Sequence, residues 1–267
     1  MLYICIPTHD EAPTIGVLLW RIRKVFQEYA REYEVLVFDD ASTDATREVL
    51  APYEKALPLT VLGGRERVGY ARATAALLKE AGRRTRYPRR DAALLMQADF
   101  TDQPEHIPDL VKRFEGGADV VVGERALSAD APEEIRKLHR YVSWIPKVPF
   151  LRNAVAVPGA SDPWSSFQLI RITVVRDLLR ANEQAGAGID GQMRDSTWFA
   201  NLELLRAAAV HARRIESVPV TPRFDLRPRE TRRAAWPEAW GLAKAAWRSR
   251  GRPPVTPPKA DSRPPTA

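Results

Sequence analysis

Apolar residues in the first half of the chain alternate between short continuous runs and longer segments with helical spacing. The short runs have the length of buried strands and lie at Leu2–Pro7, Tyr33–Phe38, Leu59–Leu62, Ala92–Met96 and Ala118–Val122. The helical segments lie between them, at Thr14–Arg31, Thr43–Tyr53, Gly69–Ala81 and Pro104–Phe114. Strands that alternate with helices in this way predict an α/β fold, with a mostly parallel central sheet and helices on both faces.

The pattern weakens in the second half of the chain. We expect an irregular region from Glu124 to about Pro163, a helix that ends at Leu178–Arg180, a helix at Leu202–His211 and a strand at Arg214–Val220. Further on, Trp236, Trp240 and Trp247 share one stripe of a predicted helix, beside Lys244 and Arg248. Repeated prolines after Gly251 predict a tail that cannot bury enough apolar surface to fold. We therefore expect a folded domain at 1–232, a Trp-rich basic amphipathic helix at 233–250 and a Pro-rich disordered tail at 251–267.

Composition narrows the class of protein only slightly. The 267 residues include 41 Lys+Arg and 34 Asp+Glu, and this surplus of +7 favours an anionic partner without naming it. No nucleic-acid recognition motif is present, so we expect no nucleic-acid partner. Cys5 is the single cysteine, which excludes a disulfide framework and favours a reducing compartment. We expect no signal peptide or spanning segment, and hence a cytoplasmic protein.

Acidic residues follow three of the predicted strands at the point where each strand ends. The segments in question are 7–11, 39–44 and 97–102, while Arg125 follows the fifth strand. Ligands of open parallel sheets bind at the carboxyl ends of the strands. Carboxylates that converge there repel one another unless a cation compensates them, and a hard divalent cation is the usual solution. The sequence therefore predicts an anion- and metal-binding site at this edge.

Helix capping offers a simpler explanation for some of these carboxylates. Asp44 and Asp102 each stand just before a predicted helix, where a carboxylate commonly caps the first turn. The adjacent pair Asp39 and Asp40 exceeds what one cap requires, and Asp99 directly follows a buried strand. We expect these three to have a ligand-binding role.

The same segments resemble the ordered motifs of family 2 glycosyltransferases. Residues 6–11, 37–44 and 97–105 are similar to the family forms IPTYNE, VDDxSxD and DADxQxxPE. Within the family the resemblance is closest to the polyprenyl-phosphate sugar synthases, such as dolichyl-phosphate mannosyltransferase. It extends through 122–125, Arg140 with Ser143, 162–168, 203–205 and 215–220.

This resemblance implies a GT-A fold with a Rossmann-like sheet, a nucleotide-sugar donor and a divalent metal, Mg or Mn. The residues that it assigns to the nucleotide sugar are Pro7, His9, Glu11, Phe38, Asp39, Asp40, Gln97, Ala98 and Asp99. Asp99 would also hold the metal. Arg125, Arg140 and Ser143 would bind an acceptor phosphate, because a guanidinium matches phosphate oxygens in geometry and charge. The resemblance thus gives catalytic roles to Asp99 and Arg125.

Several residues depart from the family pattern. Gln97 replaces the first aspartate of the DxD element, which removes a negative charge beside the metal and shifts its binding toward Asp99 and the donor diphosphate. Ser166 and Gln168 replace the glycine and arginine of the SGFR element, which bears on the acceptor. The donor is therefore more firmly indicated than the acceptor.

Three functions remain open from the sequence. The preferred one is an inverting transferase that moves a sugar from a nucleoside-diphosphate sugar to a polyprenyl-phosphate lipid. The second is a soluble relative that acts on a hydroxyl of a small molecule or protein; it would need a general base, for which Asp162 is the candidate. Asp162 has a loop-capping role as its alternative. The third, motivated by Gln97, is a catalytically weakened module that only binds nucleotide sugars.

The Trp-rich helix bears on the acceptor as well. Tryptophans beside basic residues suit a helix in the headgroup region of an anionic membrane, which would place the protein peripherally at the inner face. Packing of the tryptophan stripe back onto the domain is the alternative.

Overall fold

The computed structural model describes residues 1–127, 131–184, 197–223, 235–248 and 255. The predicted Pro-rich tail at 251–267 lies outside the described residues apart from Val255. The predicted domain limits at 232 and 233 also lie outside them.

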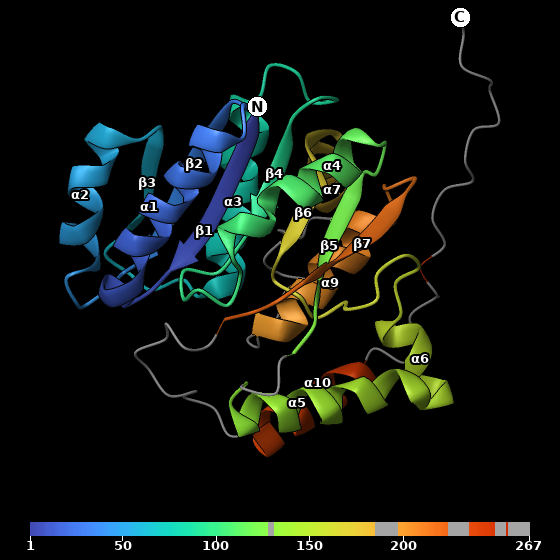
Figure 1. Cartoon of the computed structure of the whole chain (residues 1–267). Coiled ribbons are helices and arrows are strands. Elements are labelled where there is room, and N and C mark those ends of the chain that lie inside the picture. The colour runs from blue at the N-terminus through green and yellow to red at the C-terminus, as the bar shows by residue number, and fades with distance from the viewer. Residues whose placement is uncertain (128–130, 185–196, 224–234, 249–254, 256–267) are drawn as a thin grey trace, which may run out of the picture.

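A single seven-stranded sheet organises the chain (Figure 1). Its strands are β1 (Leu2–Thr8), β2 (Tyr33–Asp40), β3 (Leu59–Gly64), β4 (Ala92–Leu95), β5 (Val120–Arg125), β6 (Gln168–Arg171) and β7 (Ile215–Val220). Their spatial order is β3-β2-β1-β4-β6-β5-β7. All neighbours pair in parallel except β6, which runs antiparallel to both β4 and β5. The prediction of a mostly parallel sheet is confirmed, and β6 is an addition to it.

Nine α-helices fall within the described residues and connect or cover the strands. They are α1 (Ala12–Glu28), α2 (Thr46–Ala56), α3 (Tyr70–Arg84), α4 (Ile107–Glu115), α5 (Glu133–Trp144), α6 (Pro149–Val155), α7 (Ile172–Gln184), α9 (Thr197–Ala209) and α10 (Ala235–Arg248). Short 3-10 turns, η1 (Pro104–His106) and η2 (Ile145–Lys147), precede α4 and α6. No described helix combines the length and the apolar character needed to cross a bilayer.

Both faces of the sheet are buried, which explains why its strands read as continuous apolar runs. Successive side chains of β1 alternate between two hydrophobic clusters: Leu2, Ile4 and Ile6 face one side, and Tyr3 and Cys5 face the other. The first cluster is covered by α1, α2 and α4. The second is covered by α3, α7 and α9, and it extends to α5, α6 and α10. Helices on both faces, as predicted, are confirmed.

The region from 124 to 163, predicted to be irregular, contains two helices. Pro132 followed by the acidic pair Glu133 and Glu134 is an ordinary helix start at α5. The apolar spacing of the sequence does not indicate this helix, because its described buried positions are few, Leu138 and Val142. It packs most extensively against α10, and the two helices lie across one end of the molecule (Figure 1).

Glycine at position 63 is required by a close approach between β2 and β3. Gly63 has a φ of +125°, and a Cβ atom there would lie 2.1 Å from the carbonyl oxygen of Asp39. An L-residue would meet both a disfavoured backbone conformation and a main-chain clash. The position of Asp39 therefore depends on the absence of a side chain on the neighbouring strand.

We expect Gly63→Ala to destabilise the protein by at least about 1–3 kcal/mol, the cost of a strained backbone conformation. Gly64→Ala is the matched control, because the nearest atom to its Cβ would lie at 4.0 Å. Urea unfolding of both variants tests this. Equal stability of the two variants would contradict the prediction.

Candidate functional site

The acidic segments after β1, β2 and β4 lie side by side at the carboxyl edge of the sheet. Thr8 of β1 is in register with Asp39 of β2, and Cys5 of β1 with Leu95 of β4. Because these three strands are parallel neighbours, the segments that follow them leave the sheet together. The structure therefore brings the predicted residues of these three strand ends to one place.

The antiparallel strand β6 adds a further segment to this edge. Since β6 runs opposite to its neighbours, its amino end lies where theirs have their carboxyl ends. Residues 162–167 precede β6 and consequently reach the site. Ser166 shows this directly, because its Oγ donates a hydrogen bond of 2.9 Å to Asp102.

Backbone strain is concentrated at the same edge. Three non-glycine residues in the described part of the chain, Asp10, Ala41 and Phe100, have φ values of 54°, 54° and 64°. Each follows one of the three adjacent strands β1, β2 and β4. Left-handed conformations of non-glycine residues cost free energy and cluster at functional sites. The loops here are held in place by the surrounding structure.

The loop after β1 is bonded to the loop after β2. The Nδ1 atom of His9 lies 2.8 Å from the carbonyl oxygen of Asp40, and the Asp10 carboxylate accepts a hydrogen bond of 2.7 Å from the Thr43 amide. His9 and Asp10 are both half-buried. The imidazole ring is thus fixed at the edge of the predicted nucleoside pocket.

The Asp39 and Asp40 carboxylates are both buried, and both hold loops. Asp39 accepts from the Ser42 amide at 3.1 Å and pairs with Arg47 at 3.3 Å. Asp40 accepts from the amides of Val68 and Gly69, at 2.6 and 3.0 Å, and so ties the loop before α3 to the end of β2. Both side chains shape the loops around the predicted pocket.

The other predicted nucleoside residues on β1 and β2 are partly accessible. Pro7 and Phe38 are register partners on β1 and β2, and both are half-buried. The Glu11 carboxylate accepts a hydrogen bond of 2.8 Å from Thr14 in the first turn of α1, while the Glu11 amide donates to Thr46. Glu11 therefore also organises the start of α1.

The loop after β4 contains two buried carboxylates. Asp99 is 6% exposed and accepts a hydrogen bond of 3.0 Å from the Thr101 amide. Asp102 is 2% exposed and accepts from the Gln97 amide at 2.8 Å. Burial raises the pKa of Asp102 to about 7, and the nearby charge of Asp99 acts in the same direction. Ala98, which separates Gln97 from Asp99 in the sequence, is also buried.

Asp102 corrects one expectation from the sequence. It does not cap the following helix: the N-cap positions of η1 and α4 are Gln103 and His106, and neither makes a side-chain capping bond. Instead, Asp102 turns inward and joins the loop after β4 to the segment before β6. The hydrogen bonds that Asp102 accepts from Gln97 and Ser166 take the place of the helix cap that its position in the sequence favours.

Tyr70 is a residue that the sequence did not single out. It opens α3, and its hydroxyl donates a hydrogen bond of 2.7 Å to the side-chain oxygen of Asn201 on α9. Burial raises the pKa of Tyr70, and the carboxylates of Asp102 and Asp99 raise it further. Tyr70 therefore lies close to the buried acidic pair, contributed by a segment without any recognisable motif.

We expect Asp102→Asn to change how stability depends on pH. The folded-state pKa of Asp102 is raised from 3.8 to about 7, so the folded protein holds this proton more tightly than the unfolded chain. The contribution of the group is greatest below pH 3.8 and is lost as the pH rises through 7. Urea unfolding across this range, with a chelator present, should show a loss of stability in the wild type that the variant lacks. Parallel curves for the two proteins would contradict this.

Arg125 and Asp162 form a buried ion pair at the end of β5. The Nε and Nη2 atoms of Arg125 donate to the two carboxylate oxygens of Asp162, at 2.6 and 3.0 Å. Both side chains are only 7% exposed. The guanidinium also lies over the ring of Trp198 on α9, 4.3 Å from its centroid. The arginine is thus held on two sides.

The helix α5 passes near this ion pair. Burial lowers the pKa of His139 on α5, with opposing effects from the charges of Asp162 and Arg125. The adjacent Arg140 is exposed, as is Ser143, whose hydroxyl donates to the Arg140 carbonyl at 2.8 Å. No described contact joins Arg140 or Ser143 to Arg125. Their assignment to an acceptor phosphate stays a prediction.

We expect Asp162→Ala to cost about 3–5 kcal/mol of stability, because it leaves a buried guanidinium without its partner. Asp162→Asn retains the shape and one acceptor, and we expect a smaller loss. Glu133→Ala on α5 is the control: it removes an exposed i,i+4 pair with Lys137, which should change stability little. Urea unfolding measures all three variants. Similar losses for Asp162→Ala and Glu133→Ala would refute the interpretation.

The oxygen atoms at this edge suit a hard cation whose coordination shell is completed by a bound ligand. Within the described residues, no group of three or more His, Cys, Asp or Glu side chains could hold a metal by itself. Asp99 offers a carboxylate; burial is the main cause of the raised pKa of Asp102, and the negative charge of Asp99 adds to it. Oxygen ligands of this kind fit Mg²⁺ or Mn²⁺ when a diphosphate supplies the remaining oxygens.

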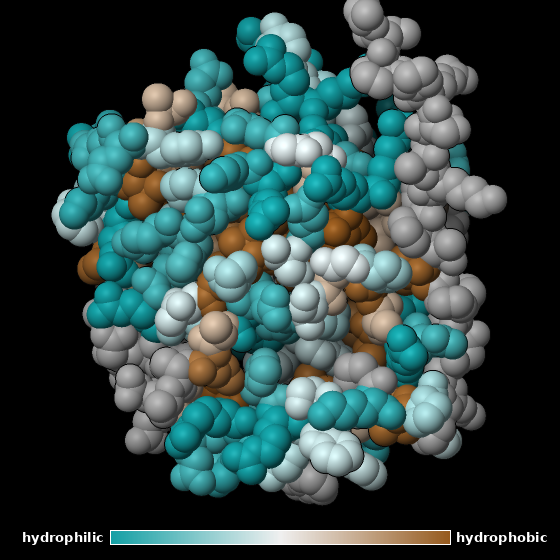
Figure 2. Space-filling view, turned by 45° about the vertical axis from the view of Figure 1, so that its right-hand side comes forward, coloured by the Kyte–Doolittle hydropathy of each residue, from teal (hydrophilic) through white to brown (hydrophobic). Residues whose placement is uncertain are grey.

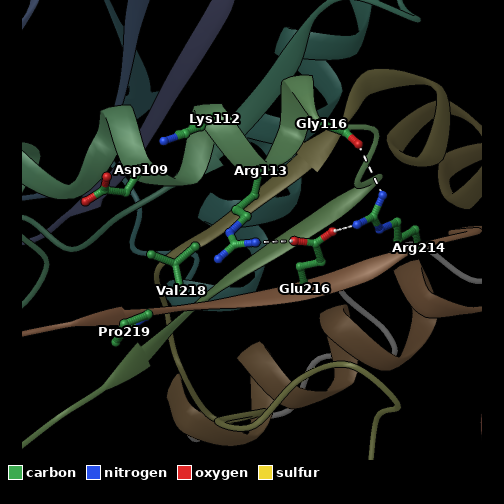
Figure 3. Close-up of a pocket in the computed structure, with 8 residues that line it drawn as sticks. All are labelled: Asp109, Lys112, Arg113, Gly116, Arg214, Glu216, Val218 and Pro219. Carbon is green, nitrogen blue, oxygen red and sulfur yellow. Dashed lines mark hydrogen bonds and ion pairs between the residues drawn. The ribbon is translucent and has the colours of Figure 1, made fainter.

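A separate hollow of about 570 Å³ lies between α4 and the edge strand β7 (Figure 3). Glu216 at its centre lies 3.5 Å from Arg113 and 2.6 Å from Arg214, and Arg214 also donates to the Gly116 carbonyl. None of the predicted site residues lines it. These arginines neutralise Glu216 within the hollow, and we assign it no role in the candidate site.

Solved structures with a similar fold identify the architecture. The mannosyltransferase PcManGT from Pyrobaculum calidifontis, solved with GDP-Man and Mn²⁺, has a TM-score of 0.56 and 21% identity, over 93% of this chain and 62% of that chain. Glucosyl-3-phosphoglycerate synthase from Mycobacterium tuberculosis has a TM-score of 0.56 and 15% identity, over 95% and 81% of the two chains. At these identities the likeness shows the fold, which is the predicted GT-A type of α/β fold.

The sequence comparison identifies the family. Residues 3–179 match the family described as glycosyl transferase family 2, and the chain belongs to it. A dolichol-phosphate mannosyltransferase from Pyrococcus furiosus is 28% identical over 175 residues, which are 64% of this chain and 46% of the relative. A bactoprenol glucosyl transferase from Shigella phage SfV is 26% identical over 176 residues, 66% of this chain and 53% of the relative. The chain spans about half the length of these curated relatives.

Proposed function

We propose that this protein transfers a sugar, with inversion, from a nucleoside-diphosphate sugar to the phosphate of a polyprenyl-phosphate lipid. Membership of family 2 supports sugar transfer, and the names of two relatives point to polyprenyl phosphates as acceptors. The layout of the edge agrees with this: buried carboxylates end β2 and follow β4, and a guanidinium ends β5.

The donor would bind over the ends of β1, β2 and β4. Pro7, His9 and Phe38 offer partly accessible flat surfaces to a nucleoside. Asp39 and Asp40 fix the surrounding loops through the bonds described above, and Glu11, Gln97 and Ala98 complete the predicted set. Asp99, at the neighbouring strand end, would face the diphosphate.

Asp99 would hold a divalent metal, Mg or Mn, together with oxygens of the donor diphosphate. Such a cation stabilises the negative charge that grows on the leaving nucleoside diphosphate. The Asp102 carboxylate accepts a hydrogen bond from the Gln97 amide, so the loop that carries Asp99 is held although residue 97 has no carboxylate.

The carrying observation for the acceptor is the bidentate pair of Arg125 and Asp162. Both oxygens of Asp162 accept from the guanidinium, so an ion pair engages the carboxylate that a hydroxyl acceptor would need as its general base. A phosphate acceptor is already anionic and needs no general base. In the described contacts Asp162 engages Nε and Nη2 of Arg125, so Nη1 would be the group that binds a phosphate oxygen. Arg140 and Ser143 on α5 would assist from the accessible side.

The test is a transfer assay that follows a thermal-shift screen of UDP-, GDP- and dTDP-sugars with Mg²⁺ or Mn²⁺. With the donor so identified, we expect product on a short-chain polyprenyl phosphate in detergent. Asp99→Asn should lower turnover by at least about a hundredfold, because stabilisation of the leaving group is lost. Asp109→Asn on α4 is the charge-matched control, since this exposed side chain lies in the separate hollow.

The other outcomes distinguish the alternatives. Transfer to a hydroxyl acceptor but never to a lipid phosphate would establish the second function, a transferase that acts on a hydroxyl of a small molecule or protein. Tight binding of a nucleotide sugar without turnover on any acceptor would establish a binding module. Unchanged turnover in Asp99→Asn would overturn the assignment of the metal to Asp99.

A further inference from the structure

The helix α10 packs through small apolar residues and leaves its tryptophans outside. Ala239, Leu242 and Ala246 are buried against the neighbouring helices. Trp240 and Trp247, two turns apart on another side, are 54% and 49% exposed. The side chain of Trp236 lies outside the described residues. The alternative in which the tryptophan stripe packs onto the domain therefore does not hold for Trp240 and Trp247, since about half of each side chain is exposed.

The neighbouring helix α5 presents a second aromatic stripe at the same end of the molecule. Its Leu138 and Val142 are buried, while Tyr141 and Trp144 are 38% and 62% exposed. The helices α5 and α10 are in extensive contact and lie side by side across this end (Figure 1). Of the eight large hydrophobic side chains that are exposed among the described residues, four therefore belong to this one helix pair.

Basic side chains accompany these aromatic residues. The Nζ of Lys147 lies 5.0 Å from the ring centroid of Trp144, and the Nζ of Lys244 lies 5.7 Å from that of Trp240. Arg140 and Arg248 are exposed on the same helices. The acidic residues of α5, Glu133 and Glu134, lie in its first turn and both pair with Lys137. The sequence of α10 has one acidic residue, Glu238, beside Lys244 and Arg248. The aromatic part of the helix pair therefore has a net positive charge.

We propose that α5 and α10 together form a docking surface for an anionic phospholipid bilayer. The surface, called here the α5–α10 face, includes Lys147 of the turn η2 that follows α5. Its other members lie on the two helices: Arg140, Tyr141, Trp144, Trp240, Lys244, Trp247 and Arg248. Tryptophan and tyrosine favour the headgroup region, where one part of the ring is apolar and another is hydrated. Lysines beside them add attraction to anionic lipid headgroups.

A bilayer fits this face better than a protein partner does. Figure 2 shows that strongly hydrophilic side chains are interspersed with pale and hydrophobic ones over the lower end of the molecule, without one continuous hydrophobic area. A stable protein interface has a core from which charged residues are depleted. In the α5–α10 face, ammonium groups lie over the indole rings themselves. This mixture suits shallow insertion among charged headgroups.

The α5–α10 face is one helix away from the candidate site. His139 of α5 is within electrostatic reach of the Arg125–Asp162 pair, and Tyr141 and Trp144 of the same helix are exposed. An α-helix with side chains is about 10–12 Å across. A lipid phosphate at headgroup depth would therefore lie within about one helix diameter of Arg125 when the face is docked. This last step rests on the proposed function, whereas the docking itself does not.

The test is co-sedimentation of the full chain with vesicles, in the absence of donor and acceptor. We expect binding to vesicles of phosphatidylcholine mixed with phosphatidylglycerol, weaker binding to phosphatidylcholine alone, and loss of binding as salt is raised. Lys147→Gln with Lys244→Gln should weaken binding to the anionic vesicles about 25-fold, since each basic residue contributes about fivefold. Trp144→Ser with Trp240→Ser should weaken binding to both vesicle types.

A matched control exists on α1. Trp20 is 54% exposed and Lys24 lies 5.9 Å from its ring centroid, so Trp20→Ser with Lys24→Gln removes the same chemistry elsewhere. Circular dichroism of each variant verifies folding. The proposal is overturned if the wild type binds neither vesicle, or if the α1 variant loses as much binding as the α5–α10 variants. It is also overturned if the face instead mediates self-association, seen as a dimer in size-exclusion chromatography that Trp144→Ser with Trp240→Ser abolishes.

The vesicle-binding test does not depend on catalysis. Transfer to polyprenyl phosphate in detergent without vesicle binding would leave the proposed function intact and remove the docking surface. Vesicle binding without transfer would do the reverse.

Discussion

The antiparallel insertion of β6 between β4 and β5 is the constraint on which the candidate site depends. Parallel pairing alone gathers the ends of β3, β2, β1 and β4, and these carry the carboxylates. A strand that runs the other way brings its preceding segment to the same edge, and this segment supplies Asp162 and Ser166. The bonds from Ser166 to Asp102 and from Arg125 to Asp162 then join the two halves of the sheet.

The energetics of this edge follow from burial. Carboxylates at strand ends would be hydrated and cheap at a surface, but Asp39, Asp40, Asp99, Asp102 and Asp162 are all buried. All five have described amide hydrogen bonds or ion pairs that offset their loss of hydration, and for Asp99 this is the bond from the Thr101 amide. Asp102 is the one whose raised pKa shows incomplete compensation. The site is stable as a network, in which each charge relies on neighbours from other elements.

Much of the fold could be predicted from the sequence because it depends on local patterns. The strands β1 to β5 are apolar runs, and the ligand-bearing loops follow them directly. The strand β6 has four residues without alternating apolar and polar positions, and α5 has few buried positions. Neither element therefore shows a periodic apolar pattern in the sequence. Within the site, the pairing of Arg125 with Asp162 and the positions of Tyr70 and Trp198 depend on contacts between distant segments. No local spacing encodes those contacts.

The close approach at Gly63 has a consequence for reading sequence variation in relatives. Any chain that keeps the spacing between β2 and β3 seen here must keep a residue without a Cβ opposite the Asp39 carbonyl. An invariant glycine at this position would thus record a limit on main-chain geometry, although it stands beside a residue with a predicted ligand role. Position 64, one residue on and free of that limit, would be expected to drift.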